Sequence, residues 1–389
     1  MKSFLYYLKE ETEAKLKHIH HAEDRPFLHG AEGYQHTVNA LNQAHEHIKS
    51  GGHSSHLTMK YDGSPAVVFG RNPENGKFFV ASKSAFNKTP KINYTHEDIA
   101  KNHGHAPGLM DKLHAALTHL PKVSPKNGVY QGDLMFTDED KKEKKNGVSF
   151  TPNTITYTAK GDEAEKVKKA KLGVIVHTQY HGKDLQSMSA DPFPDHHNFG
   201  HNSDVWHKSA EYDTRHVHYS DEDQKKYQEH MKEAEKIHKE GGQKMYSAIQ
   251  PHGGEAGHLS TYINQTVRTG ETPSVKNLQK HIQDKYKKSA EKLKTPAAQG
   301  RREAEGQQHV SHIENNKEHY ENFLKMHHHL QQAKNVLVHT LNQHEGGLEH
   351  HIDNKRTNPE GFVVNHAGEP TKLVNRAEFA RANLLKVRK

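Results

Sequence analysis

The sequence predicts an α+β fold in which antiparallel sheets with helices form one domain and a mostly helical segment is inserted into it. Short apolar runs typical of strands are confined to residues 57–84, 128–180 and 361–374. Between residues 183 and 350 strand signals nearly vanish, and long polar, helix-favouring runs replace them. Because only 32% of the residues are apolar, the core must be concentrated in part of the chain.

The first 56 residues are predicted to be helical. Residues 31–48 carry apolar or small side chains at a period close to 3.6, and Gly51-Gly52 ends this helix. The periodic positions are Ala31, Tyr34, Val38, Leu41, Ala44 and Ile48. We also expect the first turns of a helix at residues 1–11.

Strands are predicted from Leu57 onward. Two apolar runs, 67–69 and 78–80, flank the turn-forming segment 72–76, so we expect a β-hairpin there. A helix is expected over residues 97–120, with leucines and an alanine on one face. Further strands are expected at residues 128–136, 148–158, 172–180, 361–364 and 372–374.

The polar runs after residue 183 predict long helices. They cover residues 221–247, 273–294 and 307–343. The simplest organisation is a discontinuous domain of residues 1–182 and 351–389, with residues 183–350 as a helical insertion. The alternative is that the insertion is largely disordered, but scattered apolar side chains favour at least a small packed bundle. They include Tyr246, Ile249, Leu259, Tyr262, Ile263, Phe323, Leu324, Leu337 and Leu341.

Composition limits the function classes. The net charge of +7 suits a polyanionic partner, and the absence of cysteine excludes disulfides, thiolate zinc sites and thiol nucleophiles. No apolar run reaches transmembrane length, and the N-terminal apolar stretch is too short for a signal peptide, so we expect a cytoplasmic protein without a membrane partner. The 38 histidines are scattered among polar residues, which favours a solvated, weakly basic surface over metal storage.

The segment Lys60-Tyr61-Asp62-Gly63 carries the strongest functional signal. It combines a lysine, a carboxylate two residues later and a glycine at a predicted strand end. By itself the segment also fits a hairpin turn with Asp-Gly at its tip. The segments that follow it along the chain distinguish these interpretations.

Five later segments occur in a fixed order, each on a predicted strand or strand end. They are residues 78–84, 128–136, 171–180, 360–364 and 371–376. Together with the segment at Lys60, this order resembles the motifs of the covalent nucleotidyltransferase superfamily, which includes ATP-dependent DNA and RNA ligases and mRNA capping enzymes. The resemblance implies an ATP-grasp-like ligase fold for the discontinuous domain, and an ATP cofactor.

The resemblance also implies roles for four residues. Lys60 would attack the α-phosphate of ATP and hold AMP as a phosphoramidate. Glu360 would support a catalytic Mg²⁺ (or Mn²⁺), Asp62 would set the lysine and reach the metal ion through water, and Lys372 would contact the α-phosphate. Because only an unprotonated amine attacks, Lys60 needs nearby positive charge or desolvation. The alternative is a surface lysine beside a turn, with Glu360 and Lys372 in surface ion pairs.

The predicted nucleotide contacts extend beyond these four residues. Asp133 stands where the family usually has a glutamate that reaches the sugar hydroxyls. Pro65 stands where DNA ligases often carry arginine, so Lys83 would supply the missing positive charge. The full predicted cofactor-binding set is Thr58, Met59, Lys60, Gly63, Lys83, Asp133, His177, Glu360 and Lys372.

Adenine selection is expected from backbone groups near Thr58 and Met59. His177 or Val176 would lie against the base face, although both residues also fit plain core packing.

Residues 373–389 are too few for the OB-fold that many DNA ligases and capping enzymes place at this point, so none is expected. The helical insertion is then the candidate clamp for nucleic acid, although a charge run also fits a solvated face. Its most basic stretch holds Lys285, Lys287, Lys288, Lys292, Lys294, Arg301 and Arg302.

We therefore predict a monomeric ATP-dependent polynucleotide ligase that joins 5′-phosphate and 3′-hydroxyl ends of nicked or broken DNA or RNA. The choice between DNA and RNA stays open. The compact catalytic domain resembles RNA ligases and tailed-phage ligase-like proteins, which would place the enzyme in a host cytoplasm. The alternatives are a nucleic-acid-binding protein with a decayed transferase fold, and a nucleotidyltransferase with a target other than nucleic acid.

Overall fold

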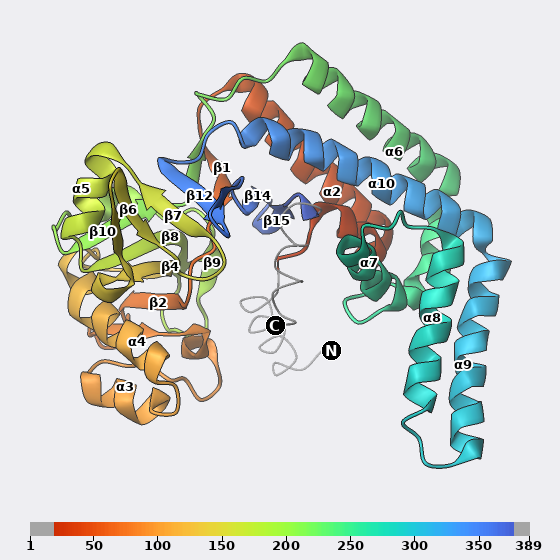
Figure 1. Cartoon of the computed structure of the whole chain (residues 1–389), viewed down its shortest axis with the longest axis horizontal. Coiled ribbons are helices and arrows are strands. Elements are labelled where there is room, and N and C mark those ends of the chain that lie inside the picture. Colours follow the sequence, from red (N-terminus) through yellow and green to blue (C-terminus); the bar gives the residue numbers. More distant parts are fainter. Residues whose placement is uncertain (1–18, 377–389) are drawn as a thin grey trace. The chain divides into compact units, whose positions relative to one another are not determined.

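The computed structural model describes residues 19–376, apart from the side chains of residues 53–56 (Figure 1). The chain forms two compact units. The strand unit contains residues 51–217 and 342–370, and the helical unit contains residues 20–50, 218–341 and 371–376. Both units are therefore discontinuous in sequence.

The largest sheet of the strand unit has six strands in the order β10-β8-β4-β2-β3, with β9 paired to β8. Its strands are β2 (Ala66–Arg71), β3 (Phe78–Ala81), β4 (Val129–Thr137), β8 (Leu172–His181), β9 (Ser189–Asp191) and β10 (Val205–Ser209). Neighbouring strands run antiparallel, except that β10 runs parallel to β8.

Both faces of this sheet are buried. Val67 and Phe69 of β2 pack with α3 (His96–His103) and α4 (Pro107–His119), which lie along one face (Figure 1). Val68 points the opposite way and packs with η2 (Lys83–Phe86). This alternation follows from the two-residue period of a strand.

Two smaller sheets complete the strands. One has the order β11-β1-β14-β15 and the other the order β13-β12-β7-β6-β5, with α5 (Gly161–Lys169) packed on β6 and β7. The first contains β1 (His53–Lys60), β11 (Glu211–Asp213), β14 (Gly361–His366) and β15 (Glu369–Leu373). The second contains β5 (Lys142–Lys144), β6 (Gly147–Phe150), β7 (Thr156–Ala159), β12 (Leu348–Ile352) and β13 (Lys355–Arg356). The pairing of β1 with β14 joins segments from early and late in the chain.

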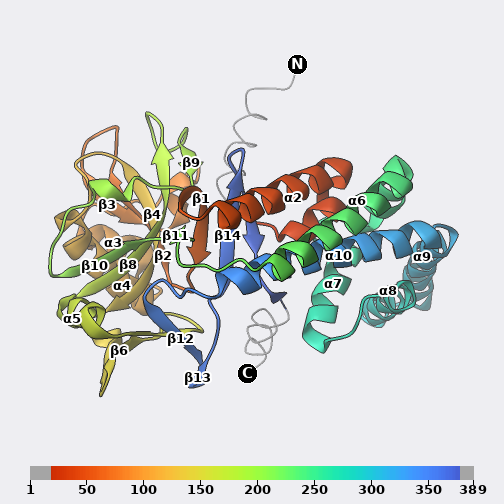
Figure 2. The same cartoon turned by 90° about the horizontal axis from the view of Figure 1, so that it is seen from above.

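The helical unit is built around α6 and α10, which lie side by side in both views (Figures 1 and 2). Its helices are α2 (Arg25–Ser50), α6 (Asp221–Ile249), α7 (His258–Thr269), α8 (Val275–Ala290), α9 (Pro296–Asn315) and α10 (Lys317–Leu341). The short helices η1 (Ala22–Asp24) and η6 (Gln250–His252) precede α2 and follow α6. Phe27, Tyr246 and Phe323 form part of the core, where Phe323 contacts both other rings.

The structure confirms an α+β fold, the hairpin of β2 and β3, and the long helices of the second half. It corrects other predictions. Residues 53–56, predicted to be helical, begin β1. The helix expected over 97–120 is two helices, because the chain turns after α3 and Pro107, which lacks an N–H, starts α4. The sheets are not purely antiparallel, since β10 is parallel to β8.

Strands also occur within residues 183–350, where only helices were predicted. Strands β9 to β12 begin in this segment, but each has at most five residues, too few for a clear period-2 pattern. The two units also differ from the predicted boundaries, since residues 20–50 pack with α6 and α10 and residues 183–217 belong with the strands.

Other predictions lie outside the described residues. They are the helix at residues 1–11 and the chain after residue 376, including most of the segment expected to lack an OB-fold. Between residues 19 and 376, no helix combines the length and the apolar character needed to cross a bilayer.

Candidate active site

Lys60 is the last residue of β1, where the strand is held on both sides. Its backbone lies opposite Gly361 of β14, and Thr58 lies opposite Val363 of β14 and Glu211 of β11. Side chains alternate along the strand, so Lys60 and Thr58 share one face while Leu57 and Met59 are buried on the other. A lysine at a strand end is held more firmly than one on a loop.

Lys60 forms an ion pair with Glu360, the residue immediately before β14. The antiparallel register explains the contact, because it places the end of β1 beside the start of β14. The side chain of Lys60 is 29% exposed and that of Glu360 is 12% exposed. A ligand can therefore reach the amine, while the carboxylate is mostly shielded from water.

Asp62 is fixed by the loop before β7. Its Oδ1 accepts a hydrogen bond from Asn153 Nδ2 at 2.8 Å, and its Oδ2 accepts from the backbone N–H groups of Thr154 at 2.7 Å and Ile155 at 2.9 Å. Its own N–H donates to Tyr157 Oη at 2.7 Å. Because a carboxylate has about four acceptor positions, these donors use most of its capacity. The carboxylate therefore holds the chain after Lys60 in place.

Gly63 brings the end of β1 against β4. A Cβ at this position would lie 2.4 Å from the Cβ of Asp133, so only glycine fits. Ser64 N–H donates to the carbonyl of Leu134 at 2.9 Å, which fixes the approach. The segment that follows Lys60 is therefore in direct contact with Asp133 and its strand.

Asp133 and His177 face each other from neighbouring strands. The distance between Asp133 Oδ1 and His177 Nε2 is 3.6 Å, and both side chains are partly exposed. His177 Nδ1 lies 2.8 Å from Thr178 Oγ1. The strand unit thus brings together Lys60 with Glu360, and Gly63 with Asp133 and His177.

The remaining predicted residues are placed differently. Lys83 is exposed at the start of η2. Lys372 belongs to the helical unit, where its N–H donates to the carbonyl of His20 at 2.9 Å, so the strand unit by itself does not contain it. Met59 is 2% exposed and its N–H donates to the carbonyl of Ala210 at 2.8 Å, so this amide is already engaged within the sheet.

Sequence reasoning missed the residues that support Lys60 and Asp62. Tyr157 and His350 are buried beside Tyr61, and the ring of His350 lies edge-on to Tyr157 at 4.9 Å. Burial raises the pKa of Tyr157 well above its usual value and lowers the pKa of His350 to about 4. The turn-forming residues 151–154 signal a loop, but nothing in the local sequence signals that this loop grips Asp62.

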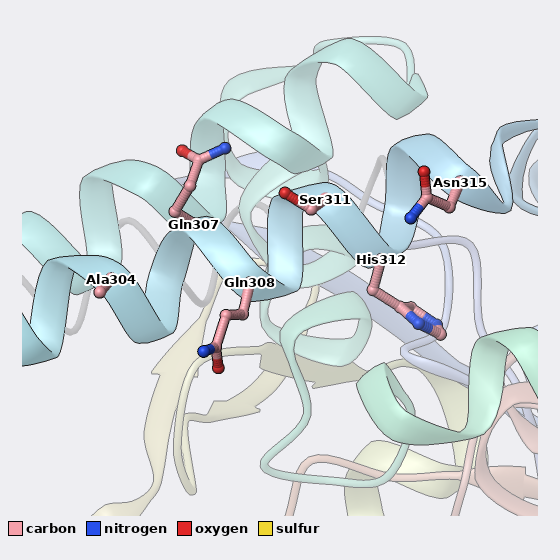
Figure 3. A pocket seen from close by; sticks show the side chains of 6 residues that line it. All are labelled: Ala304, Gln307, Gln308, Ser311, His312 and Asn315. Atoms are coloured by element: carbon pink, nitrogen blue, oxygen red, sulfur yellow. The ribbon is translucent and has the colours of Figure 1, made fainter.

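A separate hollow of about 520 Å³ lies along α9 in the helical unit (Figure 3). All six of its lining residues come from this one helix: Ala304, Gln307, Gln308, Ser311, His312 and Asn315. They are polar or small, and none belongs to the predicted site. A depression with a single helix as its wall offers a ligand few converging groups.

A family model described as a family of unknown function (DUF6267) matches residues 16–388, so the chain belongs to this family. Comparisons with curated proteins and with solved structures gave no match.

Proposed function

Because the family has no known activity, we propose from the site itself that the chain is an ATP-dependent polynucleotide ligase acting through a lysyl-AMP intermediate. The observation that carries the proposal is the ion pair of Lys60 with Glu360 at the ends of two paired strands. These are the lysine and the carboxylate that the resemblance assigns to covalent chemistry, and they are far apart in sequence. In the same unit Asp133 lies beside Gly63, and His177 faces Asp133.

The reaction has three displacements at phosphorus. First, Lys60 Nζ bonds to the α-phosphorus of ATP, pyrophosphate leaves with the electron pair of the broken P–O bond, and the amine proton passes to solvent. Second, an oxygen of a 5′-phosphate end bonds to the phosphorus of the AMP, the P–N bond breaks, and Lys60 leaves with its electron pair and takes a proton from solvent. Third, a 3′-hydroxyl attacks that 5′-phosphorus, loses its proton, and AMP leaves.

The residues around Lys60 fit these steps. An ammonium is not a nucleophile, so Lys60 must lose its proton and its pairing with Glu360 when ATP binds. Glu360 would hold Mg²⁺ or Mn²⁺, and Asp62, with most of its acceptor positions used, would reach the ion only through water. The bound ion supplies positive charge against the charge that develops on the phosphoryl oxygens.

Asp133 is suited to accept hydrogen bonds from the sugar hydroxyls, and His177 to lie against the nucleotide. Lys83 is a proposed phosphate contact, and in the helical unit the basic stretch from Lys285 to Arg302 is the proposed contact for DNA or RNA.

The test is self-labelling with α-labelled ATP or GTP in the presence of Mg²⁺. We expect label from ATP on the wild-type chain that is labile to acid and stable to alkali, as a phosphoramidate is. Lys60→Ala should abolish the label. Lys208→Ala is the matched control, because Lys208 in the same unit is also 29% exposed and pairs with Glu163 at 2.9 Å.

Persistent labelling of Lys60→Ala would refute the proposal, and so would equal loss in Lys208→Ala with the fold intact. Sealing of nicked DNA and RNA duplexes then defines the substrate. Labelling without sealing of any duplex or single strand would indicate a nucleotidyltransferase with another acceptor.

A further inference from the structure

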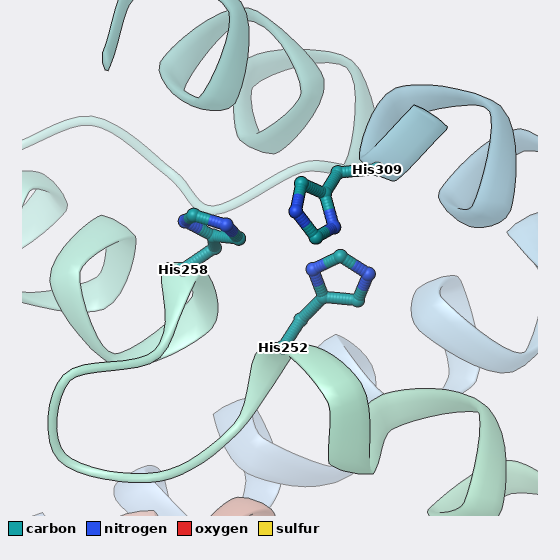
Figure 4. A group of neighbouring side chains, drawn as sticks. All are labelled: His252, His258 and His309. Atoms are coloured by element: carbon teal, nitrogen blue, oxygen red, sulfur yellow. The ribbon is translucent and has the colours of Figure 1, made fainter. Parts of the chain in front are cut away.

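Three histidines converge within the helical unit, and none of them is assigned a role in the ligase reaction. His252 ends η6, His258 begins α7 and His309 lies in α9. Each offers a ring nitrogen, and these three atoms lie within 4.8 Å of one another. Figure 4 shows the rings turned toward a common centre.

From this geometry we propose that His252, His258 and His309 bind a divalent transition-metal ion of the zinc class. Imidazole suits Zn²⁺, Ni²⁺ and Cu²⁺, whereas Mg²⁺ and Ca²⁺ require oxygen ligands. With Zn–N distances of about 2.0–2.1 Å, a tetrahedral ion brings its nitrogens to about 3.4 Å from one another. The half-buried rings of His258 and His309 need shift by only about 1 Å to reach this spacing.

Among the three histidines, His252 gives the strongest support for a metal site. Its side chain is 1% exposed, and its Nδ1 is buried without a hydrogen-bond partner. A ring nitrogen of His252 faces the other two histidines in Figure 4. A buried acceptor without a partner costs free energy, and a metal ion at the centre would satisfy it.

His258 is already oriented as a ligand. Its Nδ1 lies 3.4 Å from the ammonium of Lys285, and its Nε2 lies 3.3 Å from Tyr286 Oη. Because an ammonium can only donate, the tautomer that fits both contacts carries its proton on Nε2 and donates it to Tyr286. A metal ion bound at Nδ1 would take the place of the exposed Lys285 as the partner of that nitrogen's lone pair. Tyr286 keeps the ring in orientation, as second-layer partners do in metal sites.

The surroundings of all three imidazoles favour the neutral form that a metal requires. Burial, with smaller repulsion from neighbouring cationic groups, lowers the pKa of His252 to about 3 and that of His258 to about 4. Burial also lowers the pKa of His309, although Glu305 opposes the effect. Protons therefore compete little with a metal ion at neutral pH.

The three proposed ligands come from either side of a loop and from a separate helix. His252 and His258 flank the loop of residues 253–257, which contains three glycines, and His309 belongs to α9. An ion bound by all three would fasten this loop to α9. The expectation of a solvated histidine surface does not hold here, since His252 is buried and the other two are half-buried.

The experiment titrates the metal-stripped full-length chain with Zn²⁺ in competition with a chromophoric chelator, and follows Co²⁺ binding by visible absorption. We expect one site well above the background of weak sites that 38 histidines create. His309→Gln should weaken it by more than about 100-fold, beyond the loss typical for second-layer partners. His329→Gln is the matched control, because His329 Nδ1 lies 3.1 Å from His230 Nδ1 in the same unit, and it should bind as wild type.

Two further readouts keep the proposal testable if His309→Gln does not fold. Lys285→Met should tighten Zn²⁺ binding by about 5- to 10-fold, because it removes a like charge beside the ion. Zn²⁺ should slow proteolysis in residues 253–257 and raise the melting temperature, and Mg²⁺ should do neither. Wild-type affinity in a folded His309→Gln, no tightening in Lys285→Met, or an equal effect of Mg²⁺ would each overturn the proposal.

Discussion

The Lys60–Glu360 pair of the strand unit and the Lys334–Glu23 pair of the helical unit both join distant segments, yet they differ in burial. The side chains of Lys334 and Glu23 are 0% exposed, with Nζ 2.6 Å from Oε1, whereas Lys60 is 29% exposed. Burial, with a smaller contribution from Arg376, lowers the pKa of Lys334, and the attraction of Glu23 opposes this shift. A lysine of this kind holds a fold together.

The surroundings of the two pairs strengthen the contrast. Asp24, His327 and Arg376 join the buried pair in one network, in which Arg376 contacts Asp24 and His327 Nε2 lies 3.1 Å from Asp24 Oδ1. All of these side chains are buried. Lys60 instead ends a strand and is partly exposed, so the difference in exposure separates the proposed nucleophile from a buried lysine.

The largest expected effect is on labelling by Lys60→Arg. Arginine keeps the charge and the pairing with Glu360, but its guanidinium does not lose its proton and cannot act as the nucleophile. We expect the rate of labelling from α-labelled ATP to fall by at least about 10³-fold, as for the loss of other nucleophiles. The melting temperature should stay at the wild-type value, and residual labelling above background would contradict the assignment.

Next in size is the cost of breaking the buried pair. Lys334→Met leaves Glu23 as a buried carboxylate without its closest partner, and we expect the free energy of unfolding to fall by about 3–5 kcal/mol. Urea denaturation followed by far-UV circular dichroism measures this loss. The double variant Glu23→Gln/Lys334→Met removes both charges and should recover much of it. A loss below about 1 kcal/mol in the single variant would show that the pair is not structural.

Acid should unfold the helical unit through the same network. Lys334 and Arg376 overcome burial and hold the pKa of Glu23 at about 2, and mainly Arg376 does the same for Asp24. Both values lie below the unfolded-state values, so this stabilisation is complete above about pH 4.5 and is lost as the pH falls toward 2. Each carboxyl contributes about 2–3 kcal/mol at most.

Separate signals can follow the two units during this acid titration. Trp206 is the single tryptophan and lies in β10 of the strand unit, whereas the helical signal in circular dichroism comes mainly from the helical unit. We expect the helical signal to fall more steeply between pH 4.5 and 2 than in Glu23→Gln/Lys334→Met. An identical pH profile in that double variant would exclude the network as the cause.

The sequence predicts those features of the candidate site that depend on local patterns. The order of motifs places Lys60 and Glu360 at strand ends, and their pairing follows from the register of β1 and β14. Residues 153–155 donate hydrogen bonds to Asp62 from a turn that is distant in sequence. Hydrophobic periodicity along the chain cannot predict such a contact. The same holds for the convergence of His252, His258 and His309, because helix periodicity shows which face is apolar but not which helices meet.

The short strands and the boundaries of the two units also depend on contacts between segments distant in sequence, so local patterns did not predict them. The strand β10 pairs in parallel with β8 and covers only Val205–Ser209, so its burial depends on the sheet rather than on its own pattern. Residues 20–50 were assigned to the catalytic domain by their position in the chain. Their apolar face in fact packs on α6 and α10, and Phe27 contacts Phe323. Sequence adjacency is therefore a poor guide to domain membership in a chain whose units are both discontinuous.

The smallest expected effect completes the comparison. Lys60→Met removes the exposed member of the strand-unit pair, and partly exposed ion pairs contribute about 0–1 kcal/mol because water and salt screen them. We therefore expect a loss of at most about 1 kcal/mol in urea denaturation followed by Trp206 emission, similar to the loss in the matched variant Lys208→Met. A loss of about 3–5 kcal/mol would instead make Lys60 a structural lysine like Lys334. Lost labelling in Lys60 variants would then reflect a damaged fold, and the proposed chemistry would lose its main support.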